Sequence, residues 1–85
     1  PSRREALKKY RVITRRARPE SEQWFAAKYG EARTRLLLGN ARKAAQTIRT
    51  TQVLYPSLGG ERWRERFEAL LAACDESDRE PQPSP

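Results

Sequence analysis

Apolar residues recur at helical intervals ahead of a glycine near the middle of the chain. Phe25, Tyr29, Ala32 and Leu36 follow one another at steps of three or four positions. This spacing places side chains on one face of an α-helix. Gly39 comes three positions later, where a glycine can take the left-handed conformation that ends a helix. The pattern therefore predicts a helix that stops at Gly39.

A second helix is predicted to begin directly after that glycine. Asn40 is expected to cap it, because an asparagine side-chain oxygen can accept a hydrogen bond from the exposed amides of a first turn. The positions expected on its inner face are Ala41, Ala44, Ala45, Ile48, Gln52 and Tyr55. Pro56 closes this helix, since proline cannot continue the hydrogen-bond ladder. A connection this short predicts antiparallel helices, so residues 21–56 should form a helical hairpin.

One further helix is predicted on each side of the hairpin. In residues 1–20, small and apolar residues recur at helical spacing, so one face of this basic segment can pack against the hairpin. Residues 57–74 contain two glycines followed by an apolar stripe, which indicates a capping helix over the last exposed hairpin face. The two stripes consist of Ala6, Tyr10, Ile13 and Ala17, and of Trp63, Phe67, Leu70, Leu71 and Cys74. The predicted fold class is all-α, built from antiparallel helical hairpins.

The last segment, residues 75–85, has a different composition. It carries acidic residues and then alternating prolines, without an apolar anchor. Segments of this kind cannot bury enough apolar surface to offset the entropy of ordering. We therefore expect residues 75–85 to be disordered.

Four landmarks of the hairpin stand at the spacing of a helical repeat. They are a small residue in the first helix, a turn glycine, an alanine followed four positions later by a larger side chain, and a terminal proline. In this sequence they are Ala32, Gly39, Ala44 with Ile48, and Pro56. In order and spacing, the segment from Trp24 to Pro56 resembles a tetratricopeptide repeat (TPR). Two positions depart from the family, because Lys28 and Arg35 stand where it usually has tryptophan and tyrosine.

The resemblance implies a TPR-like solenoid segment, in which the first helices of successive repeats line a groove that receives a peptide or a helix. Upstream, Ala6 and Tyr10 with the later Pro19 look like the second helix of an earlier repeat, so the chain is expected to begin in mid-repeat. The groove-facing positions carried over to this sequence are Ala26, Tyr29, Arg33 and Leu37. Of these, Tyr29 and Arg33 are the candidate protein-binding residues. Tyr29 also belongs to the predicted core face, and Arg33 has the alternative role of an exposed arginine that contributes only solubility.

Positive charge is concentrated near the N-terminus. The 85 residues include 18 Lys and Arg against 11 Asp and Glu, a formal net charge of +7. Residues 1–20 alone hold eight Lys and Arg against two Glu. On a helix, five of these cations would form one stripe, which consists of Arg4, Lys8, Arg11, Arg15 and Arg18. Such a stripe can follow the phosphates of a nucleic acid, lie on an anionic membrane, dock on an acidic protein, or be a solvated helix face.

Composition removes several kinds of catalysis. The chain has one cysteine and no histidine, which excludes an intrachain disulfide, a zinc site with several Cys or His ligands, and Ser-His or Cys-His nucleophiles. Cys74 lies on the apolar stripe and is expected to be a buried, unreactive thiol. We therefore expect no catalytic residue, no metal and no cofactor, and hence no enzyme. No apolar run is long enough to cross a bilayer, and the single cysteine is compatible with a cytoplasmic location, which we favour without assigning one.

These observations lead to two functional hypotheses. With 36% hydrophobic and 34% charged residues, the chain has a thin core that neighbouring repeats, a protein partner or self-association would help to complete. The sequence therefore predicts a non-catalytic protein–protein interaction or scaffold module, the terminal part of a helical repeat array. The alternative is an accessory nucleic-acid-binding subunit whose basic N-terminal helix contacts phosphates. No base-reading motif is present, so binding of that second kind would be mainly electrostatic.

Overall fold

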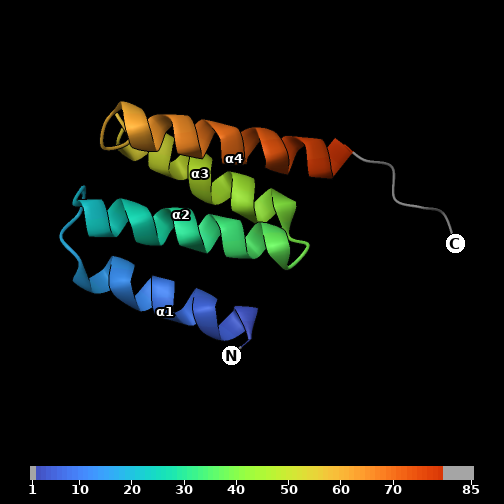
Figure 1. The fold of residues 1–85 in the computed structure, drawn as a ribbon, viewed down its shortest axis with the longest axis horizontal. Coiled ribbons are helices and arrows are strands. Elements are labelled where there is room, and N and C mark those ends of the chain that lie inside the picture. The colour runs from blue at the N-terminus through green and yellow to red at the C-terminus, as the bar shows by residue number, and fades with distance from the viewer. Residues whose placement is uncertain (1, 80–85) are drawn as a thin grey trace, which may run out of the picture.

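Four consecutive helices make up the computed structural model, which describes residues 2–79 (Figure 1). They are α1 (Arg3–Arg16), α2 (Glu22–Leu37), α3 (Ala41–Leu54) and α4 (Glu61–Arg79). Within residues 2–79 there is no strand, and the prediction of an all-α fold is confirmed. The helical hairpin expected in residues 21–56 is formed by α2 and α3, which run antiparallel (Figure 1).

Serine side chains begin the first two helices. The hydroxyl oxygen of Ser2 accepts a hydrogen bond from the backbone N–H of Glu5 at 3.2 Å, and that of Ser21 accepts one from Trp24 at 3.1 Å. Each bond satisfies one of the amides that a first helical turn leaves without an intrahelical partner. Asn40 occupies the corresponding position of α3, but its side chain makes no such bond. The prediction of side-chain capping was wrong there, because Asn40 has ψ 60° instead of the extended backbone that aims a cap at the first turn.

The turn between α2 and α3 follows the predicted glycine stop. Gly39 has φ +81°, and its N–H donates to the carbonyl of Leu36 at 3.0 Å. The N–H of Asn40 donates to the carbonyl of Arg35 at 2.9 Å. This pair of bonds closes the C-terminus of a helix around a left-handed residue. Gly39 thus ends α2 and directs the chain back into α3.

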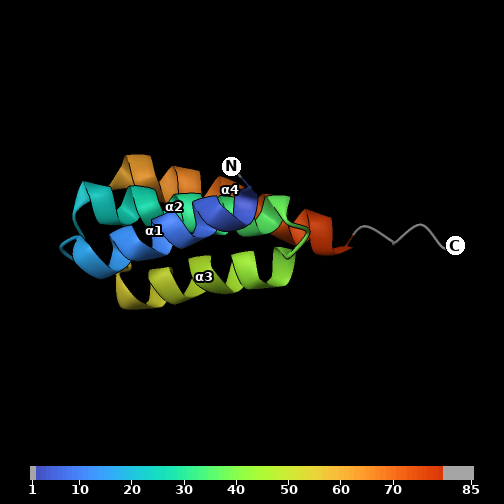
Figure 2. The ribbon, with the colours of Figure 1, turned by 90° about the horizontal axis from the view of Figure 1, so that it is seen from below.

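The helices pack in the order of the sequence. Helix α1 packs on α2, α2 on α3 and α3 on α4, while α2 also contacts α4. There is no backbone contact between α1 and α3 within the described residues. Seen from the α1 side, α3 is displaced to one side of α2 and α4 (Figure 2). Helix α2 therefore lies at the centre, with each of the other helices against part of its surface.

Aromatic rings from the second and fourth helices form much of the core. The ring of Phe25 lies edge-on to that of Phe67, with centroids 6.4 Å apart, and Tyr29 meets Phe67 at 5.7 Å. Edge-to-face pairs of this kind stabilise a core beyond their burial alone. The largest side chains that are completely buried are Phe25, Phe67, Ile48, Leu58 and Cys74. None of them comes from α1, which has no buried residue.

Two of the predicted segment boundaries were wrong. Helix α1 ends at Arg16, so Arg18 lies beyond it in the connection to α2. Helix α4 continues to Arg79, so the first residues of the segment expected to be disordered are helical. Asp75 pairs with Arg49 at 3.0 Å, and Asp78 pairs with Arg42 at 3.2 Å. These ion pairs, which could not be predicted from the sequence, connect the last turns of α4 to α3. Residues 80–85, the rest of that prediction, lie outside the described residues.

Candidate interaction surfaces

The outer side of α1 carries a row of exposed cations, which we call the basic face. It consists of Arg4, Lys8, Arg11 and Arg15. Within residues 2–79, none of these four forms an ion pair with a carboxylate. Lys8, Arg11 and Arg15 surround the partly exposed Val12 in a shallow hollow of about 220 Å³. The fifth predicted member, Arg18, is exposed but follows the end of the helix, so it is not part of the row.

The two candidate protein-binding residues of α2 have different surroundings. Tyr29 is half-buried, and its ring packs against Trp63 and Phe67 of α4, with centroids 6.0 Å and 5.7 Å away. Arg33 is exposed and makes no ion pair or side-chain hydrogen bond within the described residues. Tyr29 therefore contributes to the contact between two helices, and Arg33 is the one of the two that is open to a partner. Binding of a partner by these residues stays a prediction.

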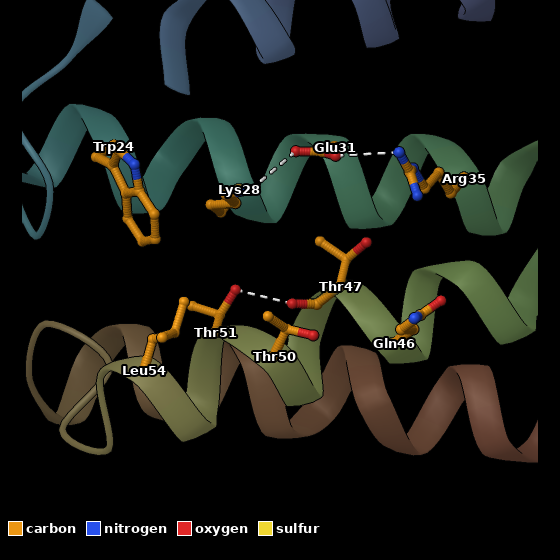
Figure 3. A pocket seen from close by; sticks show the side chains of 9 residues that line it. All are labelled: Trp24, Lys28, Glu31, Arg35, Gln46, Thr47, Thr50, Thr51 and Leu54. Carbon is orange, nitrogen blue, oxygen red and sulfur yellow. Dashed lines mark hydrogen bonds and ion pairs between the residues drawn. The ribbon is translucent and has the colours of Figure 1, made fainter. Parts of the chain in front are cut away.

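A groove of about 320 Å³ lies between the second and third helices, and we call it the α2–α3 groove (Figure 3). Helix α2 contributes Trp24, Lys28, Glu31 and Arg35, and α3 contributes Gln46, Thr47, Thr50, Thr51 and Leu54. Trp24 and Leu54 lie at one end, and Arg35 and Gln46 at the other (Figure 3). The groove thus has an apolar end and a polar end.

A buried carboxylate lies in the middle of the groove. Glu31 is only 6% exposed, and its Oε1 pairs with Nη2 of Arg35 at 3.2 Å. Its Oε2 is 3.6 Å from Nζ of Lys28, which is close enough for electrostatic attraction and too long for a hydrogen bond. Both Glu31 Oε2 and Arg35 Nε are buried without a hydrogen-bond partner. Leaving such groups unpaired costs about 1 to 3 kcal/mol each.

Only part of this site could be predicted from the sequence. Lys28 and Arg35 are departures from the TPR pattern, whereas no feature of the sequence distinguishes Glu31 between them. The three charges are spaced three and four positions apart, a pattern that is typical of a solvated helix face with surface ion pairs. Glu31 is nevertheless buried in the folded chain, where α2 lies between α1 and α3. That packing is a tertiary effect with no local signal.

The one cysteine of the chain, Cys74, is a free thiol. Cys74 is buried at 1% exposure. Its burial, together with the neighbouring charge of Asp75, raises the pKa of the thiol against the opposing effect of Arg49, and a protonated thiol is a poor nucleophile. Among the described residues, no three His, Cys, Asp or Glu side chains are grouped in a way that could hold a metal ion. In the same part of the chain, no helix is sufficiently long and apolar to span a membrane.

Comparison with known proteins identifies no family for this chain. No protein-family model matches the chain, and no curated protein or solved structure shows a significant match to it.

Proposed function

We propose that this protein is a non-catalytic protein–protein interaction module, the terminal part of a helical repeat array. The proposal rests on the one-sided packing of α1. This helix contacts α2 and has no buried residue. At the other end, α4 buries Trp63, Phe67, Leu70 and Cys74 against the hairpin. The helical stack is thus covered at the α4 end and uncovered at the α1 end. This asymmetry is expected of the terminal part of a repeat array, in which one side is capped and the other side contacts the neighbouring repeat.

The arrangement also supports a binding role without catalysis. The surfaces open to a partner include the basic face of α1, Arg33 on α2 and the α2–α3 groove. Together they present charged, hydroxyl and apolar side chains, which suit peptide recognition. An interaction module needs only such complementary surfaces.

The test is selection of peptides from a random twelve-residue phage library on the immobilised protein. Selected peptides are then titrated by fluorescence anisotropy at about 0.15 M salt, where exposed charge pairs are screened beyond about 8 Å. We expect saturable binding with a single stoichiometry. If no selected peptide binds saturably, the interaction module is the wrong function.

One observation favours a second candidate, a nucleic-acid-binding subunit. The cations of the basic face have no carboxylate partner in the described residues, so all four are available to phosphates. Generic RNA and DNA are titrated in the same assay. Non-specific binding at physiological salt has a Kd of about 10⁻⁴ to 10⁻⁶ M, so only tighter binding supports this candidate.

A matched pair of variants separates the two functions. The first replaces the basic face with glutamine (R4Q, K8Q, R11Q and R15Q). The control removes the same charge from exposed positions elsewhere (K9Q, R16Q, R62Q and R64Q). Loss of nucleic-acid binding in the first variant alone would establish the nucleic-acid function. Equal, weak binding by both variants would mean that nucleic-acid binding reflects only the net charge of the protein.

A further inference from the structure

We propose that the α2–α3 groove binds an extended peptide segment of a protein partner through the peptide main chain. In this arrangement Glu31 Oε2 accepts a hydrogen bond from a main-chain N–H, and Arg35 Nε–H donates one to a main-chain carbonyl. The inference rests on the proposed function and specifies one surface by which the module would bind.

The unpaired atoms define the kind of ligand. Glu31 Oε2 is a buried acceptor and Arg35 Nε is a buried donor, and neither has a hydrogen-bond partner within the described residues. A peptide unit offers one donor and one acceptor, so a single stretch of main chain can satisfy both. A helix cannot do so along its length, because its N–H and carbonyl groups are already bonded to one another. The ligand must therefore be extended where it meets Glu31 and Arg35.

Lys28 is the side chain that the ligand would displace. Its Nζ is 3.6 Å from Glu31 Oε2 and 5.6 Å from the centre of the Trp24 ring. The first distance is too long for a hydrogen bond, and the second lies within the range of a cation–π attraction. The side chain of Lys28 is 26% exposed, so its ammonium group can turn toward solvent. A main-chain N–H would replace it with a true hydrogen bond to a carboxylate.

The opposite wall favours donors on the ligand. The hydroxyl of Thr47 donates to the carbonyl of Lys43 at 2.9 Å, and that of Thr51 donates to the carbonyl of Thr47 at 2.8 Å. Each hydroxyl has only one hydrogen, so toward the groove both present acceptor lone pairs. Main-chain N–H groups of an extended segment match these acceptors.

The length and charge of the α2–α3 groove further define the peptide that it would bind. From Trp24 to Arg35 the groove follows α2 for about 16 Å at 1.5 Å per residue, the span of about five extended residues. The apolar end, at Trp24 and the exposed Leu54, suits an apolar side chain. Lys28 and Arg35 outnumber Glu31, so the rest of the segment is expected to be neutral or acidic. The ligand class is a short peptide with one apolar anchor and no basic residue near its centre.

The first experiment blocks the groove from exposed positions. Q46W and T50W place a large ring in the groove, and V53W adds the same ring at a site on α3 that is 79% exposed and outside it. Peptides selected on the wild-type protein are titrated against all three variants, each checked by circular dichroism. We expect the two groove variants to lose at least tenfold in affinity, the scale of a lost hydrogen bond to a charged group, and V53W to match the wild type.

The second experiment tests the main-chain contact itself. R35K keeps the positive charge beside Glu31 and removes the Nε–H group. The selected peptide is also remade with one main-chain nitrogen methylated at a time. We expect about a tenfold loss for R35K and for methylation at one central position. A peptide that tolerates methylation at every position, or that depends on an Asn or Gln side chain instead, would overturn main-chain recognition.

The outcomes keep the two proposals separate. Peptides that bind wild type, Q46W, T50W and R35K equally would overturn the groove as the site, while leaving the interaction module intact. A failure to select any binding peptide would overturn the interaction module itself.

Discussion

The ring of Tyr10 in α1 lies directly over Gly30 in α2. A Cβ atom built on Gly30 would come within 2.5 Å of the ring carbons Cε1 and Cζ. No side chain other than hydrogen fits at that position while the ring stays where it is. Because α1 has no fully buried residue, this contact is a principal part of its attachment to the hairpin.

We predict that G30A loosens α1 selectively. Alanine favours a helix over glycine by about 1 kcal/mol, but its methyl group must displace the Tyr10 ring, and overpacking of this kind costs about 1 to 3 kcal/mol. Hydrogen exchange should therefore become faster in α1 and stay unchanged in α3 and α4. The double variant Y10L/G30A should recover part of the protection, since leucine lacks Cε1 and Cζ, the two ring carbons that come nearest to the added methyl group. Uniformly faster exchange in all four helices would contradict a local effect.

The helices were predictable because each one carries its signal locally. The apolar spacing from Phe25 to Leu36 and the glycine at the end of α2 define that helix without reference to the rest of the chain. The end of α4 was not predictable in this way. Asp75 and Asp78 looked like the start of a polar tail, and only the arginines that α3 places opposite them make these turns favourable. The hairpin followed from the apolar periodicity and from the short connection at Gly39, and the TPR resemblance remains a prediction.

The candidate surfaces were predictable to a smaller degree. The basic face follows from helical spacing alone, apart from Arg18, which a break in the helix removes. The α2–α3 groove could not be predicted, because the burial of Glu31 depends on how α1 and α3 pack against α2. Periodicity gives the face of a helix that a residue occupies, but it does not give the width of the gap between two neighbouring helices.

Two glycines with positive φ should differ in their tolerance of alanine. Gly39 has φ +81° and open space around it, whereas Gly59 has φ +77° and a Cβ there would lie 2.6 Å from Cδ2 of Phe25. The left-handed conformation costs alanine about 1 to 2 kcal/mol at either site. Phe25 is 1% exposed and cannot move aside, so G59A should cost about 1 to 3 kcal/mol more. Urea denaturation of both variants measures the difference, and equal destabilisation would argue against the Phe25 contact.

Alkaline pH should destabilise the protein partly through Cys74. Burial and the charge of Asp75 raise the pKa of the thiol in the folded state, although Arg49 opposes them. Between the pKa of the unfolded chain and the higher folded value, the folded state binds more protons. The free energy of unfolding therefore falls as pH rises from about 8.5, the ordinary pKa of a thiol. Urea denaturation of wild type and C74A between pH 7 and pH 10 should show a steeper decline for the wild type. Parallel curves would show that the thiol does not contribute.

The aspartates near the end of α4 should affect local order more than global stability. A negative charge is unfavourable near a helix C-terminus, and the pairs Asp75–Arg49 and Asp78–Arg42 offset this. The side chains of all four residues are between 43% and 86% exposed, so each pair is worth about 0.2 to 1 kcal/mol. D75N and D78N should leave the melting temperature almost unchanged while amide exchange in the last two turns of α4 becomes faster. Raising the salt concentration should reproduce the effect in the wild type, and no change in exchange would mean that the pairs do not hold the helix end.

Replacing Glu31 should separate stability from binding. E31L removes a buried carboxylate with an unpaired oxygen but leaves both of its cationic neighbours, and removing one partner of a buried ion pair costs about 3 to 5 kcal/mol where the remaining charge stays buried. Arg35 and Lys28 are both partly exposed, so they can extend their charged ends into solvent once the carboxylate is gone. We expect the melting temperature of E31L to stay the same or to rise, by about 4 to 8 °C for each kcal/mol in a domain of this size, and peptide binding in the α2–α3 groove to be lost. E31Q is the matched control, because it keeps the shape of Glu31 but places an amide in the groove. A large drop in the stability of E31L would instead identify Glu31 as a structural ion-pair centre.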